Sequence, residues 1–192
     1  HVVEPVPSLF AAIPAAPRLH KYPVAISAEC SPLQLHLASN PEANSVDRHI
    51  SEAFGLGETV TVRGITLEKF LEENKLRGKV ALLKVDIEGA EKMLFASTSD
   101  ATLQEIPQIS IEFHDFVEGS TDLPFVLDTI SRMKKLGFFF LPYSYLMPYA
   151  KHADVLFLQP TMCGLSFYER THLVLARFLL EVQGWKARLK GD

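Results

Sequence analysis

The chain has 192 residues, of which 47% are apolar and 22% charged, the length and composition of one ordinary globular domain. A net charge of -4, without a basic stripe, argues against a nucleic-acid-binding protein, whose affinity comes mainly from clustered lysine and arginine. The two cysteines, Cys30 and Cys163, have no metal-type spacing and make no disulfide framework, and no apolar run reaches the ~18 residues of a membrane span. These features predict a soluble cytoplasmic protein with no nucleic-acid partner and no membrane span.

The first fifty residues differ in composition from the rest of the chain. They are rich in proline and contain no glycine. Within them, Val2 and Val3 form a short strand-like piece that ends in Glu4, although Glu4 before Pro5 also fits a solvated turn. From Gly55 onward, strand-like and helix-like segments alternate. Repeated alternation predicts an α/β sheet with helices on both faces.

The clearest elements of the first half follow that region. Val60–Ile65 is a predicted strand, and Thr66 is placed to cap a helix that runs through Lys75. Residues 80–87 form a nearly continuous apolar run, which is typical of a parallel strand covered on both faces. The next helix is predicted to begin near Gly89.

The second half repeats the alternation. Residues 108–114 are predicted to form a buried strand and residues 124–136 a helix with apolar residues at helical spacing. Residues 138–141 and 154–158 are predicted strands, close enough in sequence to form an antiparallel pair. The last predicted element is a long, rather apolar helix over residues 167–182.

The ends of these strands carry most of the candidate functional residues. In an open α/β sheet, ligands bind outside the carboxyl ends of the strands. The acidic or titratable residues there are Glu4, Asp86, Glu88, Glu112 and His114. Because uncompensated carboxylates are costly to desolvate, we interpret their expected convergence along one edge as a ligand site.

Each of these residues also has a purely structural interpretation. Asp86 and Glu88 are placed to cap the helix that begins near Gly89, where a carboxylate satisfies free amides and the helix dipole. His114 fits equally well as a core histidine bonded to the backbone. Both interpretations stay open, and capping and ligand contact are compatible for the two acids.

Residues 80–91, Val-Ala-Leu-Leu-Lys-Val-Asp-Ile-Glu-Gly-Ala-Glu, resemble the most distinctive motif of FkbM-type methyltransferases. That motif is an apolar strand running into Lys-hydrophobic-Asp-hydrophobic-Glu-Gly-Ala-Glu. Three weaker similarities, at residues 4–10, 24–27 and 107–114, occur in the order expected of the family. The resemblance covers residues 1–160.

The resemblance implies a class I, Rossmann-like fold: a doubly wound, mostly parallel sheet with an antiparallel C-terminal strand pair. It implies an S-adenosylmethionine-dependent enzyme that methylates a hydroxyl group on a sugar, glycan, lipid or natural product. Glu4 takes the place of the acid that binds the ribose hydroxyls, and Asp86, Glu88 and Gly89 are the other expected cofactor contacts. His114 or Asp86 is the candidate catalytic base, and no metal is implied.

The chain departs from the family pattern at both ends. Its first glycine is Gly55, so the first strand and the glycine-rich cofactor loop are missing, and we expect the chain to be an N-terminally incomplete fragment. The predicted organisation is a partial methyltransferase domain at residues 1–160 and a helical extension at residues 161–192 that packs on the same domain. A homo-oligomer contact through that helix is the alternative.

Two other functions remain open at this point. The first is a non-catalytic Rossmann-like binding module, which the missing loop favours. The second is a metal-dependent transferase or phosphoesterase in which Asp86 and Glu88 hold Mg²⁺. No phosphate-binding glycine loop accompanies those two acids, which argues against the second alternative.

Overall fold

The computed structural model describes residues 1–38, 44–45, 56–113, 123–142 and 154–190. The chain divides into two compact units, and each is built from two separate stretches of sequence. The first unit consists of His1–Leu76 and Ile87–Ser99, and the second of Arg77–Asp86 and Asp100–Asp192. The boundary predicted at residue 160 stays a prediction.

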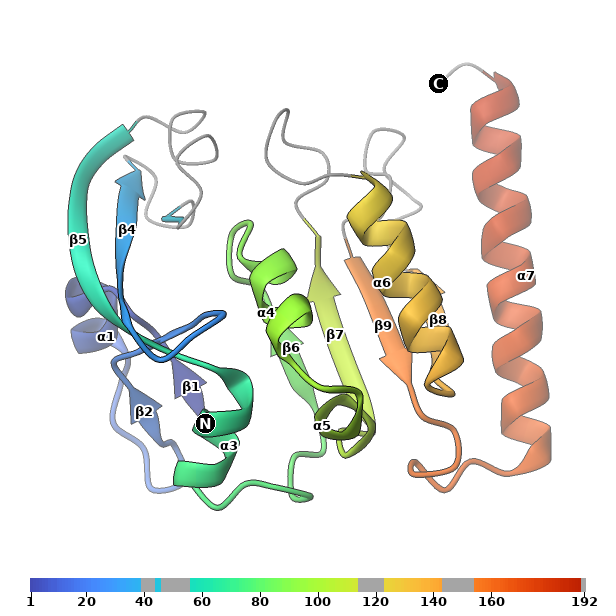
Figure 1. Ribbon diagram of the computed structural model, residues 1–192. Coiled ribbons are helices and arrows are strands. Elements are labelled where there is room, and N and C mark those ends of the chain that lie inside the picture. Colours follow the sequence, from blue (N-terminus) through green and yellow to red (C-terminus); the bar gives the residue numbers. More distant parts are fainter. Residues whose placement is uncertain (39–43, 46–55, 114–122, 143–153, 191–192) are drawn as a thin grey trace. The chain divides into compact units, whose positions relative to one another are not determined.

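The first unit combines short strands with three helices of the described chain (Figure 1). Its elements are β1 (Val2–Val3), α1 (Pro7–Ala12), β2 (Lys21–Tyr22), β3 (Ala25–Ile26), β4 (Pro32–Ala38), β5 (Leu56–Ile65), α3 (Leu67–Glu73) and α4 (Glu91–Ser97). β1 pairs with β2 in parallel. β5 pairs in parallel with β3 and antiparallel with β4. The sequence indicated β1, β3 and β5 but neither β2 nor β4.

The core of the first unit lies where α1 meets the strands. Its buried apolar cluster consists of Val6, Ala25, Leu35 and Val62. Close packing also explains a glycine in β5: a Cβ on Gly64 would lie 2.4 Å from the Ser31 carbonyl oxygen and 2.7 Å from Ser27 Oγ. Glycine is therefore required for the segment before β4 to approach β5 so closely.

The predicted helix after β5 is confirmed as α3. Its N-cap is Thr66, whose hydroxyl accepts a hydrogen bond from the Lys69 N–H at 3.2 Å. The buried residues are the predicted apolar ones, Leu67, Phe70 and Leu71. The helix ends at Glu73 rather than at Lys75, because Lys75 adopts a left-handed conformation with φ of 56°.

The second unit is built around one four-stranded sheet. Its elements are β6 (Leu83–Val85), α5 (Asp100–Gln104), β7 (Gln108–Glu112), α6 (Leu123–Lys135), β8 (Phe139–Pro142), β9 (Asp154–Leu158) and α7 (Phe167–Lys190). The strand order is β6-β7-β9-β8, with β6 parallel to β7 and β9 antiparallel to both of its neighbours. The predicted antiparallel pair is confirmed as β8 and β9.

The two units together form a mixed α/β structure. In the described part of the chain, three strand pairs are parallel and three are antiparallel. The α/β prediction is confirmed at that level. A mostly parallel sheet is not what these strands form, because the long β4–β5 pair and both pairs of β9 are antiparallel.

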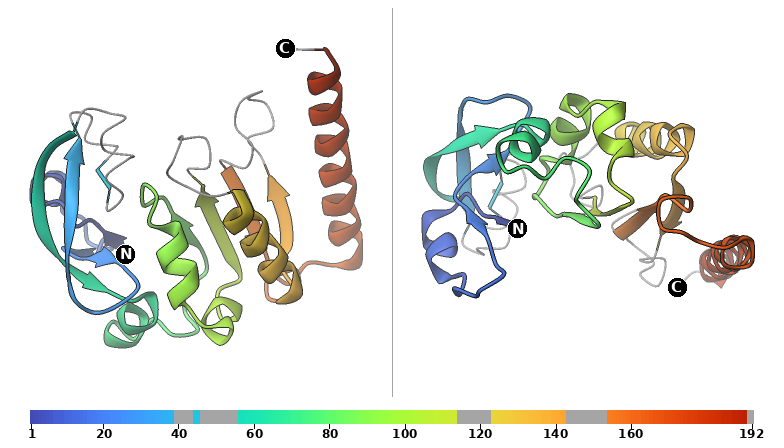
Figure 2. Two further views of the ribbon diagram at one scale, coloured as in Figure 1. Left: turned by 45° about the horizontal axis from the view of Figure 1, so that its top comes forward. Right: turned by 90° about the horizontal axis from the view of Figure 1, so that it is seen from below.

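The two faces of the second unit's sheet differ in character. One face is apolar and is covered by α6 (Figures 1 and 2). Its buried residues are Val85, Ile109, Ile111, Phe140, Val155 and Phe157, and those of α6 are Val126, Ile130 and Met133. Because side chains alternate along a strand, Lys84, Glu112 and Asp154 belong to the opposite face. All three are at least partly exposed.

The strand that carries the family-like motif is shorter than the sequence predicts. Residues 80–87 were expected to form a strand buried on both faces, but only Leu83–Val85 is strand. Leu82 is 54% exposed and Lys84, within the strand, is 47% exposed, so the expectation of burial on both faces is wrong. The reason is pairing: within the described residues, β6 pairs with β7 alone, and only from Leu83 onward.

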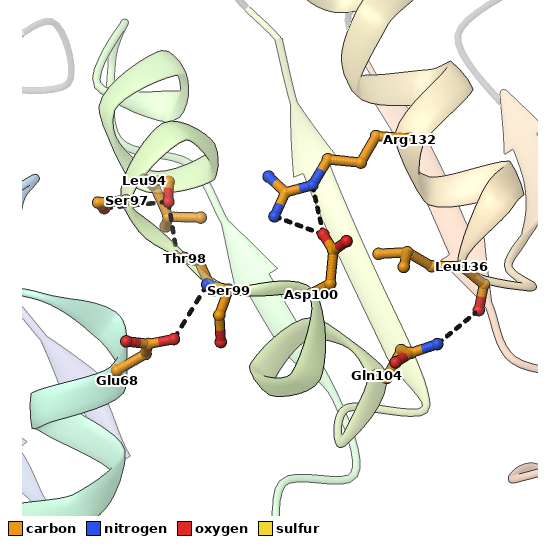
Figure 3. Close-up of polar contacts among 9 residues, drawn as sticks. All are labelled: Glu68, Leu94, Ser97, Thr98, Ser99, Asp100, Gln104, Arg132 and Leu136. Carbon is orange, nitrogen blue, oxygen red and sulfur yellow. Dashed lines mark hydrogen bonds and ion pairs between the residues drawn. The ribbon is translucent and has the colours of Figure 1, made fainter.

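Polar contacts tie α5 to α6 in the second unit (Figure 3). The Arg132 guanidinium lies 2.7 Å from Asp100 Oδ1. Gln104 Nε2 donates to the carbonyl oxygen of Leu136 at 3.5 Å. These contacts explain why the short α5, which the sequence did not reveal, has a fixed place beside α6.

The last helix, α7, reaches Lys190 and is longer than predicted. Its start is a capping box, in which the Ser166 N–H donates to Glu169 Oε2 at 2.8 Å and the Glu169 N–H donates to Ser166 Oγ at 3.3 Å. α7 contacts β8. Its exposed large apolar residues are Phe167, Tyr168, Val174, Leu175, Phe178 and Leu179. Packing on the same domain and a homo-oligomer contact both stay predictions for this helix.

Among the described residues, none of the helices combines the length and the apolar character needed to cross a membrane.

Candidate functional site

The carboxyl ends of β6 and β7 carry a cluster of charged side chains. Parallel pairing aligns Val85 with Ile111, so the residues that follow, Asp86 and Glu112, end their strands side by side. Lys84 Nζ lies 3.2 Å from Asp86 Oδ2 and 3.7 Å from Glu112 Oε2. One lysine therefore links the acidic ends of two neighbouring strands.

A third carboxylate, Asp154 on β9, lies opposite Glu112 in the antiparallel register. Partial burial acts to lower the pKa of Lys84, but the Asp86, Glu112 and Asp154 carboxylates together outweigh it and raise that pKa above 10.5. Lys84 is therefore a cation at neutral pH. With three acids around one base, the cluster is acidic on balance, which favours neutral or cationic ligands over anionic ones.

A turn at residues 88–90 follows the charged cluster directly. Glu88 has a φ of 50° and Gly89 a φ of 90°, so both lie in the left-handed region. Glycine adopts this conformation freely, whereas glutamate rarely does. The turn leads into α4, whose N-cap is Ala90.

Glu91, the first residue of α4, holds this turn from inside. Its side chain is 0% exposed. Glu91 Oε1 accepts hydrogen bonds from the N–H groups of Ile87, at 3.4 Å, and Gly89, at 3.3 Å. Two amides before the helix are thus satisfied by Glu91, and the N-cap residue Ala90 makes no side-chain cap hydrogen bond. Capping by Asp86 and Glu88 stays a prediction.

Ser45 contacts the same turn from a distant part of the sequence. It is 0% exposed, and its hydroxyl donates a hydrogen bond to the carbonyl oxygen of Glu88. Ser45 is itself fixed by two backbone hydrogen bonds with His36 of β4, at 2.8 and 3.0 Å. The turn is therefore attached to the β4–β5 framework of the first unit.

Glu4 follows β1, as the sequence predicted. The residue is half-buried, and Glu4 Oε1 accepts a hydrogen bond from the Val6 N–H at 2.7 Å. That bond places the carboxylate at the start of α1 and fixes its direction. The bond is compatible with the turn interpretation as well as with a ligand contact, so both stay predictions.

The predicted site residues have different outcomes. Asp86 lies in the charged cluster, and Glu88 and Gly89 form the turn that follows it. Glu4 belongs to the first unit and Asp86 to the second, so their predicted convergence stays a prediction. His114 lies outside the described residues.

Sequence reasoning missed three residues of this region: Lys84, Ser45 and the inward role of Glu91. Lys84 could have been predicted, because residues two apart on a strand share a face, which places Lys84 beside Asp86. Ser45 had no such signal, since it lies 43 positions before Glu88 in the chain.

In the ranges that the structure describes, no three His, Cys, Asp or Glu side chains come together in a way that would hold a metal ion. The alternative in which Asp86 and Glu88 bind Mg²⁺ therefore gains no support from the geometry.

Comparison with known proteins gives one match. A family model for the methyltransferase FkbM domain matches residues 1–140. No curated protein and no solved structure gives a match. The matched region contains the charged cluster, the turn and Glu4, whereas α7 lies beyond it.

Proposed function

Because the chain belongs to the FkbM methyltransferase family, we propose that it methylates a hydroxyl group with S-adenosylmethionine as the methyl donor. The acceptor class that we propose is a sugar, glycan, lipid or natural product. The observation that carries the proposal is the coincidence of the family motif with an exposed carboxylate, Asp86, at the carboxyl end of β6. Strand ends of this kind are where open α/β sheets bind their ligands.

The residues present fit the chemistry of the donor. S-adenosylmethionine has ribose hydroxyls and an ammonium group, and both donate hydrogen bonds to carboxylates. Glu4 is a half-buried carboxylate whose direction is fixed by the Val6 N–H, and we assign it to the ribose hydroxyls. Asp86, Glu88 and the backbone of Gly89 are the proposed contacts for the methionine part of the donor. When bound, the donor would supply an electrophilic methyl group to the acceptor oxygen, with S-adenosylhomocysteine as the leaving group.

Asp86 is our candidate for the proton acceptor of this reaction. Its carboxylate lies at the carboxyl end of β6, and Lys84 Nζ lies 3.2 Å from Asp86 Oδ2. In this role Asp86 would accept the proton that the acceptor hydroxyl loses when its oxygen takes the methyl group. Such a positioned base contributes about 10²–10⁴-fold to a rate. His114 is the second candidate for this role.

The test is calorimetric titration of S-adenosylhomocysteine into the full natural polypeptide that contains this chain. Glu4→Ala is expected to weaken binding roughly tenfold or more, because hydrogen bonds to a charged group are lost. The matched control is Glu72→Ala, which removes the same charge from an exposed position of α3. The control is expected to bind as tightly as the unaltered protein.

The outcomes separate the possibilities. Binding that is weakened by Glu4→Ala alone supports the proposal. Absence of binding to the unaltered protein overturns the cofactor assignment. Binding without transfer of labelled methyl groups to any hydroxyl-bearing acceptor favours the non-catalytic binding module instead.

A further inference from the structure

The turn after β6 needs an explanation of its own. Glu88 adopts a left-handed conformation with φ of 50°, and this costs a non-glycine residue about 1–2 kcal/mol. Such conformations persist only where the surroundings impose them, and they cluster at functional sites. The question is therefore which groups impose this one.

Two buried side chains form hydrogen bonds with three backbone groups in the turn and directly before it. Glu91 accepts the N–H groups of Ile87 and Gly89, and Ser45 donates to the carbonyl oxygen of Glu88. The two side chains hold the turn through opposite hydrogen-bonding roles, one as acceptor and one as donor. Shifting the turn breaks bonds to both.

Neither side chain is available to a ligand, since Glu91 and Ser45 are both 0% exposed. A fully buried carboxylate is costly unless hydrogen bonds satisfy it. If packing were the only effect of Glu91, an apolar residue of similar volume would stabilise the fold more, because it has no charge to desolvate. What an apolar residue does not supply is an acceptor for two amides.

We propose that Glu91 and Ser45 are positioning residues that hold the Glu88–Gly89 turn in its left-handed form for cofactor binding. This inference rests on the proposed function, in which the turn adjoins S-adenosylmethionine. Ser45 connects the turn to β4, so the framework of the first unit fixes the geometry of the motif. Neither residue touches the cofactor or the acceptor.

The experiment compares Glu91→Ala, Glu91→Gln and Ser45→Ala in the full natural polypeptide. The readouts are the dissociation constant of S-adenosylhomocysteine and the hydrogen-exchange rates of the Ile87 and Gly89 amides. The matched control is Ser97→Ala, because the Ser97 hydroxyl also donates to a backbone carbonyl, that of Met93 at 2.8 Å, but within α4.

We expect Glu91→Ala to speed exchange at both amides and to weaken binding roughly tenfold or more, since an acceptor shared by two amides is lost. Glu91→Gln keeps an oxygen acceptor and is expected to recover most of the affinity. Ser45→Ala is expected to weaken binding less, because it removes a single hydrogen bond. Ser97→Ala is expected to leave the dissociation constant unchanged.

Three results overturn the inference. One is an unaltered dissociation constant in Glu91→Ala and Ser45→Ala while exchange accelerates. Another is equal loss of affinity in Glu91→Gln and Glu91→Ala. The third is equal loss in Ser97→Ala and Ser45→Ala. If Glu91→Ala does not fold, Glu91→Gln and Ser45→Ala carry the test. Failure of the unaltered protein to bind at all is a different result, because it overturns the proposed function itself.

Discussion

The motif at residues 84–91 consists of two halves that differ in solvent exposure. In the first half, Lys84 and Asp86 are exposed by 47% and 41% and pair with each other at the end of β6. In the second half, Glu91 is fully buried and bonds only to the backbone in the hydrogen bonds described above. Exposure thus separates the half for which we propose a chemical role from the half for which we propose a positioning role.

The largest effect tests the exposed half. Asp86→Asn is expected to lower kcat for methyl transfer about 10²–10⁴-fold, because the proposed base is lost. Thermal stability is expected to change little, since surface ion pairs contribute little. Asp100→Asn is the control, because it breaks another exposed ion pair, with Arg132, on α5 and α6. Equal loss of kcat in both variants contradicts the assignment of Asp86.

The next effect tests the buried half through stability. Ser45→Ala leaves the carbonyl oxygen of Glu88 without its buried donor, and we expect the free energy of unfolding to fall by about 1–3 kcal/mol. Urea denaturation measures this change. If the loss is no larger than that of Lys84→Met, exposure does not separate the two halves as we argue.

A smaller effect concerns the cation beside the proposed base. Lys84→Met removes the ammonium group that lies 3.2 Å from Asp86 Oδ2 and 3.7 Å from Glu112 Oε2. We expect kcat to fall by less than in Asp86→Asn, because the proposed base itself remains, with a stability change below about 1 kcal/mol. Lys92→Met, on an exposed position of α4, is the control. A loss of kcat in Lys84→Met as large as in Asp86→Asn argues against Asp86 as the base.

The smallest expected effect concerns Glu169, an exposed counterpart of the buried Glu91. Glu169 also accepts a backbone N–H, that of Ser166, but in solvent, and hydrogen bonds from the Ser166 hydroxyl and amide lower its pKa below 4.5. A carboxyl pKa that is lower in the folded state stabilises the fold at pH values above the ordinary pKa. This contribution is lost as the pH falls through the lowered pKa of the folded state. The start of α7 is therefore expected to weaken only below pH 4.5, as followed by the chemical shift of the Ser166 amide. In Glu169→Gln the same titration is expected to be flat.

The sequence predicted best the elements whose pattern is local. Thr66, the apolar face of α3 and the antiparallel β8–β9 pair were all visible in periodicity and capping signals. The extent of β6 was not, because pairing in the sheet decides how much of an apolar run becomes a strand. β2 has only two residues and carries no pattern of its own. β4 was missed although Leu33 to Leu37 alternate between apolar and polar residues, the pattern of a half-buried strand.

For the candidate site, the sequence indicated which residues belong to the site better than it indicated what each side chain does there. Asp86 was identified from its place after a strand. The roles of Glu91 and Ser45 depend on which backbone groups they reach, and no spacing rule reports a contact across 43 residues. The family resemblance marked Glu91 as part of the motif without indicating that it is buried.

The division of the chain into two interleaved units has a consequence for cutting and for synthesis. The chain passes between the units after Leu76, Asp86 and Ser99. A single cut after Asp86 leaves neither unit whole, because each unit then loses one of its two stretches. A cut after Leu76 keeps both stretches of the second unit on one fragment, and a cut after Ser99 keeps both stretches of the first. During translation, the first unit stays incomplete until Ser99 has left the ribosome, when β6 of the second unit is already made. The shortest N-terminal fragment that contains the whole first unit is therefore residues 1–99, and it necessarily carries Lys84 and Asp86 with it.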